Sequence, residues 1–287
     1  MGEVVDSKPI AGNIRSSVSE LVSRSREMGI DPLIAILRIG KDPASEFYFR
    51  AKIKRAADFS VQSRAITMSE SSFAEEVHEV IDNLASDPSV HGIIVEAPVP
   101  SHLSYKEIVN RIPWYKDIDG ATYANLGKLM SGDDCVVAAT PLAVMRYIEY
   151  LKLERGSQVA VINRTITVGR PLSQLLLNSD YTPVVCHSKT ADIRSICRAS
   201  DAVVVAAGQP RFLNGEFVSK KSVVIDVGIN SVEGKIVGDA DFDAIWEKVR
   251  CITPVPGGVG SLTSLIIFEN LMRAIEFQHG ANIQGHS

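Results

Sequence analysis

Apolar and polar residues alternate along this chain with two periods, one typical of buried strands and one typical of amphipathic helices. A helical pattern from near Ile10 to Met28 is followed by the apolar run Leu33 to Leu37, which predicts a strand. The same order recurs almost throughout. Further strands are expected at Val61 to Ile66, Gly92 to Ala97, Val159 to Asn163, Pro183 to His187, Ala202 to Ala206 and Val223 to Val227. The pattern predicts an α/β fold whose parallel sheets are covered by helices.

The pattern changes most sharply near the middle of the chain. The polar stretch Lys128 to Cys135 is followed by Thr140-Pro141 and a helical pattern that continues to Leu151. Threonine is a good N-cap residue, and proline is tolerated at the first helical position. We therefore expect one domain to end near residue 140, with Thr140 as the N-cap of the helix that opens a second α/β domain.

The run Thr253 to Gly260 holds two prolines and three glycines, so it cannot be regular structure and must form a shaped loop. The apolar spacing from Leu262 to Ile275 predicts an amphipathic helix directly after it. Helix N-termini favour anions, and glycines let a ligand approach the main chain. The loop is therefore interpreted either as a binding loop or as a tight helix entry.

Composition narrows the kind of partner. The chain has 287 residues, 45% of them hydrophobic, which is enough for a substantial core and predicts two domains. A net charge of -4 without long basic runs argues against nucleic acid and favours a small molecule. Acidic residues stand where a signal peptide needs basic ones, and no window approaches about 18 apolar residues, so we expect a cytoplasmic protein without a membrane segment. The cysteines are widely separated, which predicts free thiols and no metal site: Cys135, Cys186, Cys197 and Cys251.

The second half carries the order of a mononucleotide-binding unit. The strand Val159 to Ile162 leads through Asn163 to Pro171 into a helix, with only Gly169 at the place of the last glycine of GxGxxG. The incomplete motif also fits a plain strand-to-helix turn. The next strand ends at Cys186 to Thr190, where an NAD site would place an acid, yet Ser188 and Lys189 stand there. With Arg164 they suit a 2′-phosphate and hence NADP.

The first half carries three candidate groups. Tyr48 and Lys52 lie four residues apart, hence on one helix face, although a surface lysine with a packed tyrosine is the commoner meaning of that spacing. Short-chain dehydrogenases use such a pair, but after their dinucleotide-binding strands rather than before them. Glu96 ends an apolar strand, where an ionised group needs a partner. Lys116 to Gly120 holds two carboxylates and is either part of a site or a solvated turn.

Taken in order, these segments resemble the bifunctional methylenetetrahydrofolate dehydrogenase/methenyltetrahydrofolate cyclohydrolase family, usually called FolD. The segments that carry the resemblance are Ser45 to Lys52 with Lys54, Pro98-Val99-Pro100, Lys116 to Gly120, Thr140-Pro141, Arg164 to Pro171, Cys186 to Thr190, Asp226 to Asn230, Gly238-Asp239 and Thr253 to Gly260. The resemblance implies two α/β domains with a cleft between them and a homodimer. It implies a catalytic domain of residues 1–140 plus 262–287 and a Rossmann-like NADP-binding domain of residues 141–261.

By the same resemblance, a hydride passes from 5,10-methylenetetrahydrofolate to NADP, and water then opens the methenyl product to 10-formyltetrahydrofolate. Tyr48 would stack on the folate, Lys52 would be the central catalytic group, and Asp119 would hydrogen-bond the pterin ring. Lys52 must then be able to release and regain a proton. The loop residues Pro256, Gly257 and Gly258 would contact the folate. The nucleotide would be held by Thr140, Arg164 and Ser188 around the 2′-phosphate and by Asn163, Thr165, Gly208 and Ile229 along its length.

Several positions depart from the family pattern, among them Glu96 and Asn163. Glu96 stands where the family has glutamine, and a carboxylate beside Lys52 would favour the ammonium form, with a gross attraction on the order of 4 kcal/mol at about 4 Å before desolvation. A protonated Glu96 could instead donate a hydrogen bond as glutamine does. We therefore expect a cyclohydrolase that is weakened or needs a higher pH. Asn163 replaces a glycine, and asparagine tolerates a positive φ there.

Three alternatives remain open from the sequence. The first is a monofunctional NADP dehydrogenase whose cyclohydrolase is lost through Glu96. The second is a folate-binding or regulatory protein without turnover, which the joint presence of Tyr48, Lys52 and Asp119 disfavours. The third is an NADP reductase for another small substrate, which leaves Asp119 and the prolines at 98 and 100 unexplained.

Overall fold

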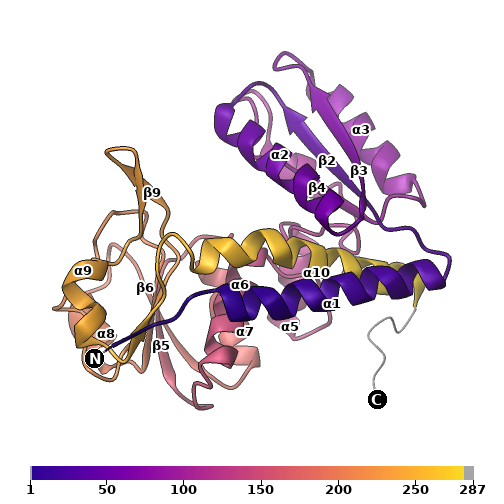
Figure 1. The fold of residues 1–287 in the computed structure, drawn as a ribbon. Coiled ribbons are helices and arrows are strands. Elements are labelled where there is room, and N and C mark those ends of the chain that lie inside the picture. Colours follow the sequence, from indigo (N-terminus) through magenta and orange to yellow (C-terminus); the bar gives the residue numbers. More distant parts are fainter. Residues whose placement is uncertain (1, 281–287) are drawn as a thin grey trace. The chain divides into compact units, whose positions relative to one another are not determined.

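The computed structural model describes residues 2–280 and confirms the α/β class (Figure 1). The chain divides into two compact units. The first unit comprises residues 14–137 and the segment that starts at Ser264, and the second comprises the residues before Ile14 together with 138–263. Two of the three divisions fall inside helices, α1 (Lys8–Glu27) and α10 (Val259–His279), and the third falls between residues 137 and 138, just before the helix that begins at Ala139.

A three-stranded parallel sheet in the order β3-β2-β4 forms the centre of the first unit. Its strands are β2 (Leu33–Ile39), β3 (Gln62–Met68) and β4 (Gly92–Val95), and Ile36 of β2 pairs with Ala65 and with Ile94. The other helices of this unit are α2 (Pro43–Asp58), α3 (Ala74–Ser86), α4 (Tyr105–Val109) and α5 (Tyr123–Ser131). The strands match the expected apolar runs.

One core of this unit lies between the sheet and α3, which Figure 1 shows alongside β2 and β3. Ala35, Leu37 and Ile39, at alternate positions of β2, belong to this core, as the pleat of a strand requires for residues on one face. Val77 and Ile81 of α3 pack in the same cluster and are fully buried. Burial of each such side chain stabilises the fold by about 1.5–3 kcal/mol, so packing rather than helix propensity holds α3 in place.

A six-stranded sheet in the order β1-β11-β8-β7-β5-β6 forms the centre of the second unit, and every neighbouring pair is parallel. Its strands are β1 (Glu3–Val4), β5 (Gln158–Ile162), β6 (Thr182–Cys186), β7 (Ala202–Val205), β8 (Val223–Asp226) and β11 (Cys251–Ile252), with a separate hairpin of β9 (Asn230–Val232) and β10 (Lys235–Val237). The helices are α6 (Ala139–Tyr150), α7 (Gly169–Asn178), α8 (Ile193–Ala199), α9 (Phe242–Ile245) and a 3₁₀ turn, Trp246–Lys248.

The start of α6 and the division into domains differ from the predictions made from the sequence. The helix expected to be capped by Thr140 begins one residue before it, and Ala138 is the N-cap without a side-chain hydrogen bond. Pro141 then lies in the first turn, where its missing N–H loses no helical hydrogen bond. The expected domain division differs from the compact units most at residues 1–13, because Glu3 and Val4 pair with Cys251 and Ile252. The other two boundaries differ by three residues (138–140) and two residues (262–263).

The four cysteines are free, with Cys135 half-buried and the other three buried. Within residues 2–280, no helix is both long and apolar enough to cross a membrane.

Candidate active site

The centre of the first unit's candidate site is an ion pair between Lys52 and Glu96. Lys52 lies on α2, and Glu96 directly follows β4. Lys52 Nζ donates to both carboxylate oxygens of Glu96, at 2.7 and 2.9 Å. The Glu96 side chain is only 4% exposed and that of Lys52 19% exposed, so the pair is largely withdrawn from water. The partner that a carboxylate at this strand end requires is therefore Lys52.

Tyr48 lies one helical turn before Lys52 on α2, and its ring is half exposed. The Lys52 ammonium lies 5.9 Å from the centre of that ring, so the two side chains share one face of the helix as their spacing predicted. The neighbouring Phe47 ring meets Tyr48 edge-on with 5.5 Å between centroids. An exposed aromatic surface beside a cationic group can stack on a flat ring of a ligand.

The loop Lys116 to Gly120 is an ordered structure and not a solvated turn. Asp117 is 1% exposed, and its carboxylate accepts hydrogen bonds from the main-chain N–H groups of Ala121 and Thr122 and from Asn125 Nδ2. Ile93 N of β4 donates to Lys116 O at 2.7 Å, which ties the loop to the strand that ends at Glu96. These contacts fix the main chain on which Asp119 stands.

Asp119 lies two residues after Asp117 in the same loop, and burial and neighbouring charges act on its carboxyl. Burial raises the pKa of Asp119 to about 6, while the charge of Lys52 lowers it and those of Asp117 and Glu96 raise it. Tyr105 at the start of α4 is influenced by the same three carboxylates. Burial first, and then the charges of Asp119, Asp117 and Glu96, raise the pKa of Tyr105, so its hydroxyl stays protonated. No pattern along the chain singles out Tyr105.

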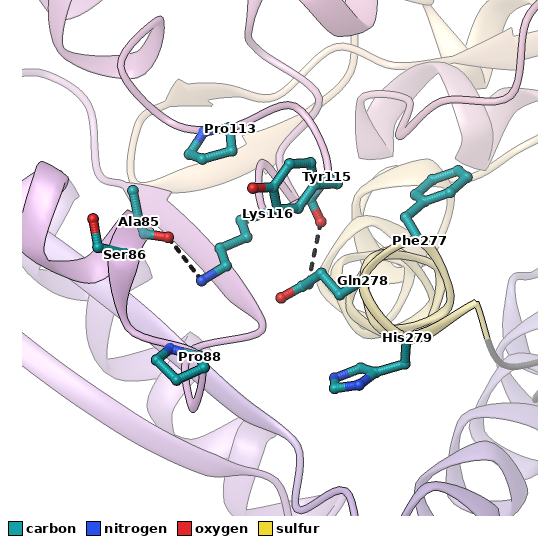
Figure 2. A pocket seen from close by; sticks show the side chains of 9 residues that line it. All are labelled: Ala85, Ser86, Pro88, Pro113, Tyr115, Lys116, Phe277, Gln278 and His279. Atoms are coloured by element: carbon teal, nitrogen blue, oxygen red, sulfur yellow. Dashed lines mark hydrogen bonds between the residues drawn. The ribbon is translucent and has the colours of Figure 1, made fainter.

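Lys116 has a structural role on the other side of this loop. It lines a cavity of 610 Å³. Figure 2 shows Tyr115 and Gln278 among the other residues that line it. Lys116 Nζ donates to the carbonyl oxygens of Ala85 and Asp87 at 2.9 and 2.7 Å. Burial lowers the pKa of Lys116, and the charge of Asp87 opposes this. Its ammonium therefore holds the Asp117–Asp119 segment against the end of α3 rather than serving as a proton donor in the site.

In the second unit, the turn between β5 and α7 explains the incomplete glycine motif. A Cβ at Gly169 would lie 2.1 Å from Asn163 O, so the start of α7 approaches the strand too closely for any other residue. Asn163 does not have a positive φ, contrary to the conformation considered for it. Its Oδ1 accepts from Gly169 N and Thr165 N, and its Nδ2 donates to Ala206 O at 2.7 Å. Asn163 thus shapes the turn through its side chain.

Polar side chains gather where β5 and β6 end. Ile162 pairs with Cys186 in the parallel register, so the residues that follow them lie at the same edge of the sheet. Arg164, Ser188 and Lys189 are exposed there, and their side chains make no hydrogen bond or ion pair with the described part of the chain. Unpaired cationic and hydroxyl donors suit a phosphate, as predicted for NADP.

The turns after β7 and β8 lie at the same edge, since Val205 pairs with Asp226. Gly208 has φ +65°, and nothing lies within 4 Å of the place where a Cβ would stand. Ile229 is 58% exposed, so an apolar side chain is accessible at this edge. Thr140 lies in the first turn of α6, and the sheet register does not by itself bring it to this edge.

The loop Thr253 to Gly260 follows β11 at the carboxyl edge of the same sheet. Gly257 has φ +103°, and a Cβ at Gly258 would lie 2.3 Å from Pro254 O, so both positions require glycine. A Cβ at Gly260 would lie 3.3 Å from Ile229 Cδ1, which brings the loop next to the turn after β8. The loop has the compact shape that its composition predicted.

The fold and these groups define a class of protein. Ligands bind at the carboxyl edge of a parallel sheet where the strand order reverses, and β5 is followed by β6 on one side and β7 on the other. The second unit is therefore a dinucleotide-binding fold, and the first unit carries a buried lysine–carboxylate pair beside an exposed aromatic ring.

The chain belongs to the tetrahydrofolate dehydrogenase/cyclohydrolase family. Residues 5–119 match the family's catalytic domain, and residues 138–279 match its NAD(P)-binding domain. The FolD resemblance seen in the sequence is thereby confirmed.

Similar proteins cover almost the whole chain. The bifunctional protein FolD of Thermoplasma volcanium is 44% identical over 264 residues, 92% of this chain and 93% of that protein. The crystal structure of a bifunctional 5,10-methylenetetrahydrofolate dehydrogenase/cyclohydrolase from Thermoplasma acidophilum is 42% identical, covers 97% of this chain and all of that chain, and superposes with a TM-score of 0.92. The Trypanosoma brucei enzyme, solved with NADP cofactor and an inhibitor, is 32% identical with a TM-score of 0.90 and covers 98% and 99% of the two chains.

Proposed function

We propose that this protein oxidises 5,10-methylenetetrahydrofolate to 5,10-methenyltetrahydrofolate with NADP and hydrolyses the product to 10-formyltetrahydrofolate. The observation that carries the proposal is the Lys52–Glu96 pair beside the half-exposed Tyr48. The similarity to proteins named as bifunctional supports both activities. A dehydrogenase without cyclohydrolase activity is therefore not the favoured alternative.

In the first unit, the folate would stack on Tyr48, and Asp119 would accept hydrogen bonds from its pterin ring. In the hydrolysis, a neutral Lys52 amine would take a proton from the attacking water, and the resulting ammonium would return it to the ring nitrogen that is released. Glu96 would hold Lys52 in place for both transfers. Pro256, Gly257 and Gly258 of the loop in the second unit would contact the folate.

The second unit fits NADP by the chemistry of its free donors. Arg164 and Ser188 would hold the 2′-phosphate together with Thr140, while Asn163, Thr165, Gly208 and Ile229 would follow the rest of the nucleotide. NADP, when bound, supplies the hydride acceptor. The protein's contribution to that step is to hold the donor carbon and the nicotinamide in line.

We propose residues 1–140 plus 262–287 as the catalytic domain and 141–261 as the NADP-binding domain, in a cytoplasmic homodimer. The test of the whole proposal is an assay of the purified protein with 5,10-methylenetetrahydrofolate and either NADP or NAD, followed for formation and decay of the methenyl product. No methenyl product with either nucleotide would contradict the proposed function.

Arg164→Ala is expected to raise KM for NADP by roughly 10- to 100-fold, because a charge-assisted contact to a phosphate is lost. The smaller activity with NAD should stay the same, since NAD has no 2′-phosphate. Steady-state kinetics with both nucleotides measure this. Arg170→Ala, also exposed and on α7, is the matched control. An equal loss with NAD and NADP would contradict a 2′-phosphate contact at Arg164.

Glu96→Gln is expected to move the cyclohydrolase pH–rate profile toward lower pH by roughly one to two units. Glu96 is the charged acceptor of both Lys52 hydrogen bonds, and its replacement by a neutral amide removes that attraction for the ammonium. The dehydrogenase profile of the same variant is the internal control, because hydride transfer needs no proton from Lys52. Superimposable cyclohydrolase profiles would end this interpretation of Glu96.

A further inference from the structure

Two buried aspartates lie directly behind the carboxyl edge of the second unit's sheet. Asp226 ends β8 and is 3% exposed, and Asp239 follows β10 and is fully buried. Neither forms an ion pair with a lysine or arginine of residues 2–280. A buried carboxylate destabilises the fold unless its oxygens accept hydrogen bonds. The donors around these two aspartates therefore show which segments the carboxylates connect.

Asp226 binds main-chain groups from two loops. Its Oδ1 accepts from Gly228 N at 2.9 Å and from Asp239 N at 3.0 Å, and its Oδ2 accepts from Ala240 N at 2.8 Å. Burial raises the pKa of Asp226 to about 6, the three main-chain hydrogen bonds lower it, and the charge of Asp239 raises it again. The carboxylate thus fixes the turn after β8 against the segment that carries Asp239.

Asp239 reaches a third loop. Its Oδ2 accepts from Gly208 N at 2.8 Å, and its Oδ1 accepts from Asn230 Nδ2 at 2.8 Å. One side chain therefore connects the turn after β7 with the residue that follows Ile229. In the sequence, Gly238-Asp239 was notable only as one of the segments that carry the family resemblance. A glycine directly before an acidic residue was the one local feature that could have pointed to this site.

The glycines next to the two aspartates pack so closely against the carboxylates that a side chain at either position would clash. A Cβ at Gly228 would lie 2.3 Å from Asp239 Cγ, and a Cβ at Gly238 would lie 1.9 Å from Asp226 Oδ2. Both carboxylates are in direct contact with main chain, and the loops cannot shift without breaking these contacts. Gly208 and the Ile229 side chain are exposed at the edge. The buried Asp239 fixes the main chain at Gly208 and at Asn230, next to Ile229.

We propose that Asp239 is a positioning residue for NADP, which sets the distance between the Gly208 turn and the Ile229 turn and so keeps the nucleotide slot open in one shape. The inference rests on the proposed function, because it takes these two turns as nucleotide contacts. Asp239 itself does not touch the nucleotide. Its hydrogen bond occupies Gly208 N–H, which leaves the open side of that glycine toward the ligand.

The test compares Asp239→Ala and Asp239→Asn with a core variant, Val159→Ala, in the full-length protein. Val159 is fully buried at the amino end of β5, so its truncation weakens the same sheet away from the nucleotide edge. The measurements are the melting temperature, Kd for NADP by calorimetry, KM and kcat of the dehydrogenase, and the cyclohydrolase rate without nucleotide. If Asp239→Ala does not fold, Asp239→Asn carries the test, because its amide still accepts one hydrogen bond but places a donor opposite Asn230.

The expected result is a rise of roughly tenfold or more in Kd and KM for NADP in Asp239→Ala and a smaller rise in Asp239→Asn. The cyclohydrolase rate should stay near that of Val159→Ala, whose NADP affinity should equal the wild type. Unchanged NADP affinity in both Asp239 variants, with only a lower melting temperature, would overturn the inference and leave the proposed function intact. A wild type that does not bind NADP would overturn both.

Discussion

Lys52→Met is expected to reduce the cyclohydrolase rate by roughly 10²- to 10⁴-fold, the contribution typical of a positioned general acid–base group. The dehydrogenase should fall much less, because hydride transfer depends on alignment and not on a proton from Lys52. The two rates are measured separately, as hydrolysis of added methenyltetrahydrofolate and as its formation with NADP. Lys54→Met, exposed on the same helix, is the matched control.

The Lys52 variant also leaves Glu96 as an unpaired buried charge, and breaking such a pair destabilises a protein by about 3–5 kcal/mol when it is fully buried. The double variant Lys52→Met/Glu96→Gln separates the two effects. It should regain stability in thermal unfolding and remain without cyclohydrolase. Recovery of hydrolysis in the double variant would show that Lys52 is not the proton-transfer group.

Asp119→Asn is expected to raise KM for the folate by roughly 10- to 100-fold, because charged acceptors for the pterin donors are lost in a partly buried place. In the wild type, Asp119 is ionised above about pH 6 because burial raises its pKa to about 6. KM for the folate should therefore rise as the pH falls below about 6. This dependence should vanish in Asp119→Asn.

The control for Asp119 is Asp58→Asn, which removes an exposed acid paired with Arg55 at the end of α2. Titration of the folate itself appears in every variant, so only a change confined to Asp119→Asn reports on that carboxyl. A folate KM with the same pH dependence in wild type and Asp119→Asn would contradict the proposed contact with the pterin.

Much of the fold follows from local pattern. The runs that became β2, β5, β7 and β8 are continuous apolar segments, which suits strands covered on both sides by helices. The start of α6 was predicted wrongly from local pattern. Thr140 is a good N-cap residue, but the helix begins at Ala139, one residue before it. Cap preference is a matter of about 1 kcal/mol, and packing of a largely buried helix outweighs it.

Some residues of the candidate site could be predicted from the sequence, and others could not. Spacing alone placed Tyr48 and Lys52 on one face, and the strand end made Glu96 a residue in need of a partner. That the partner is Lys52 came from the resemblance and is confirmed by the two hydrogen bonds. Tyr105 and the hydrogen bonds of Asp239 could not be found in this way, because their partners are brought near only by the sheet order and by loops distant in sequence.

The sequence by itself determined the α/β class, the shaped loop at Thr253 to Gly260 and the basic donors in place of an acid after β6, since these depend on neighbours along the chain. Only the tertiary structure decided that Asp117 and Asp226 are buried and bound to main-chain N–H groups while Asp119 has its pKa raised to about 6. The physical reason is that the ionisation and role of a carboxylate depend on what surrounds it in space, and sequence distance does not measure that.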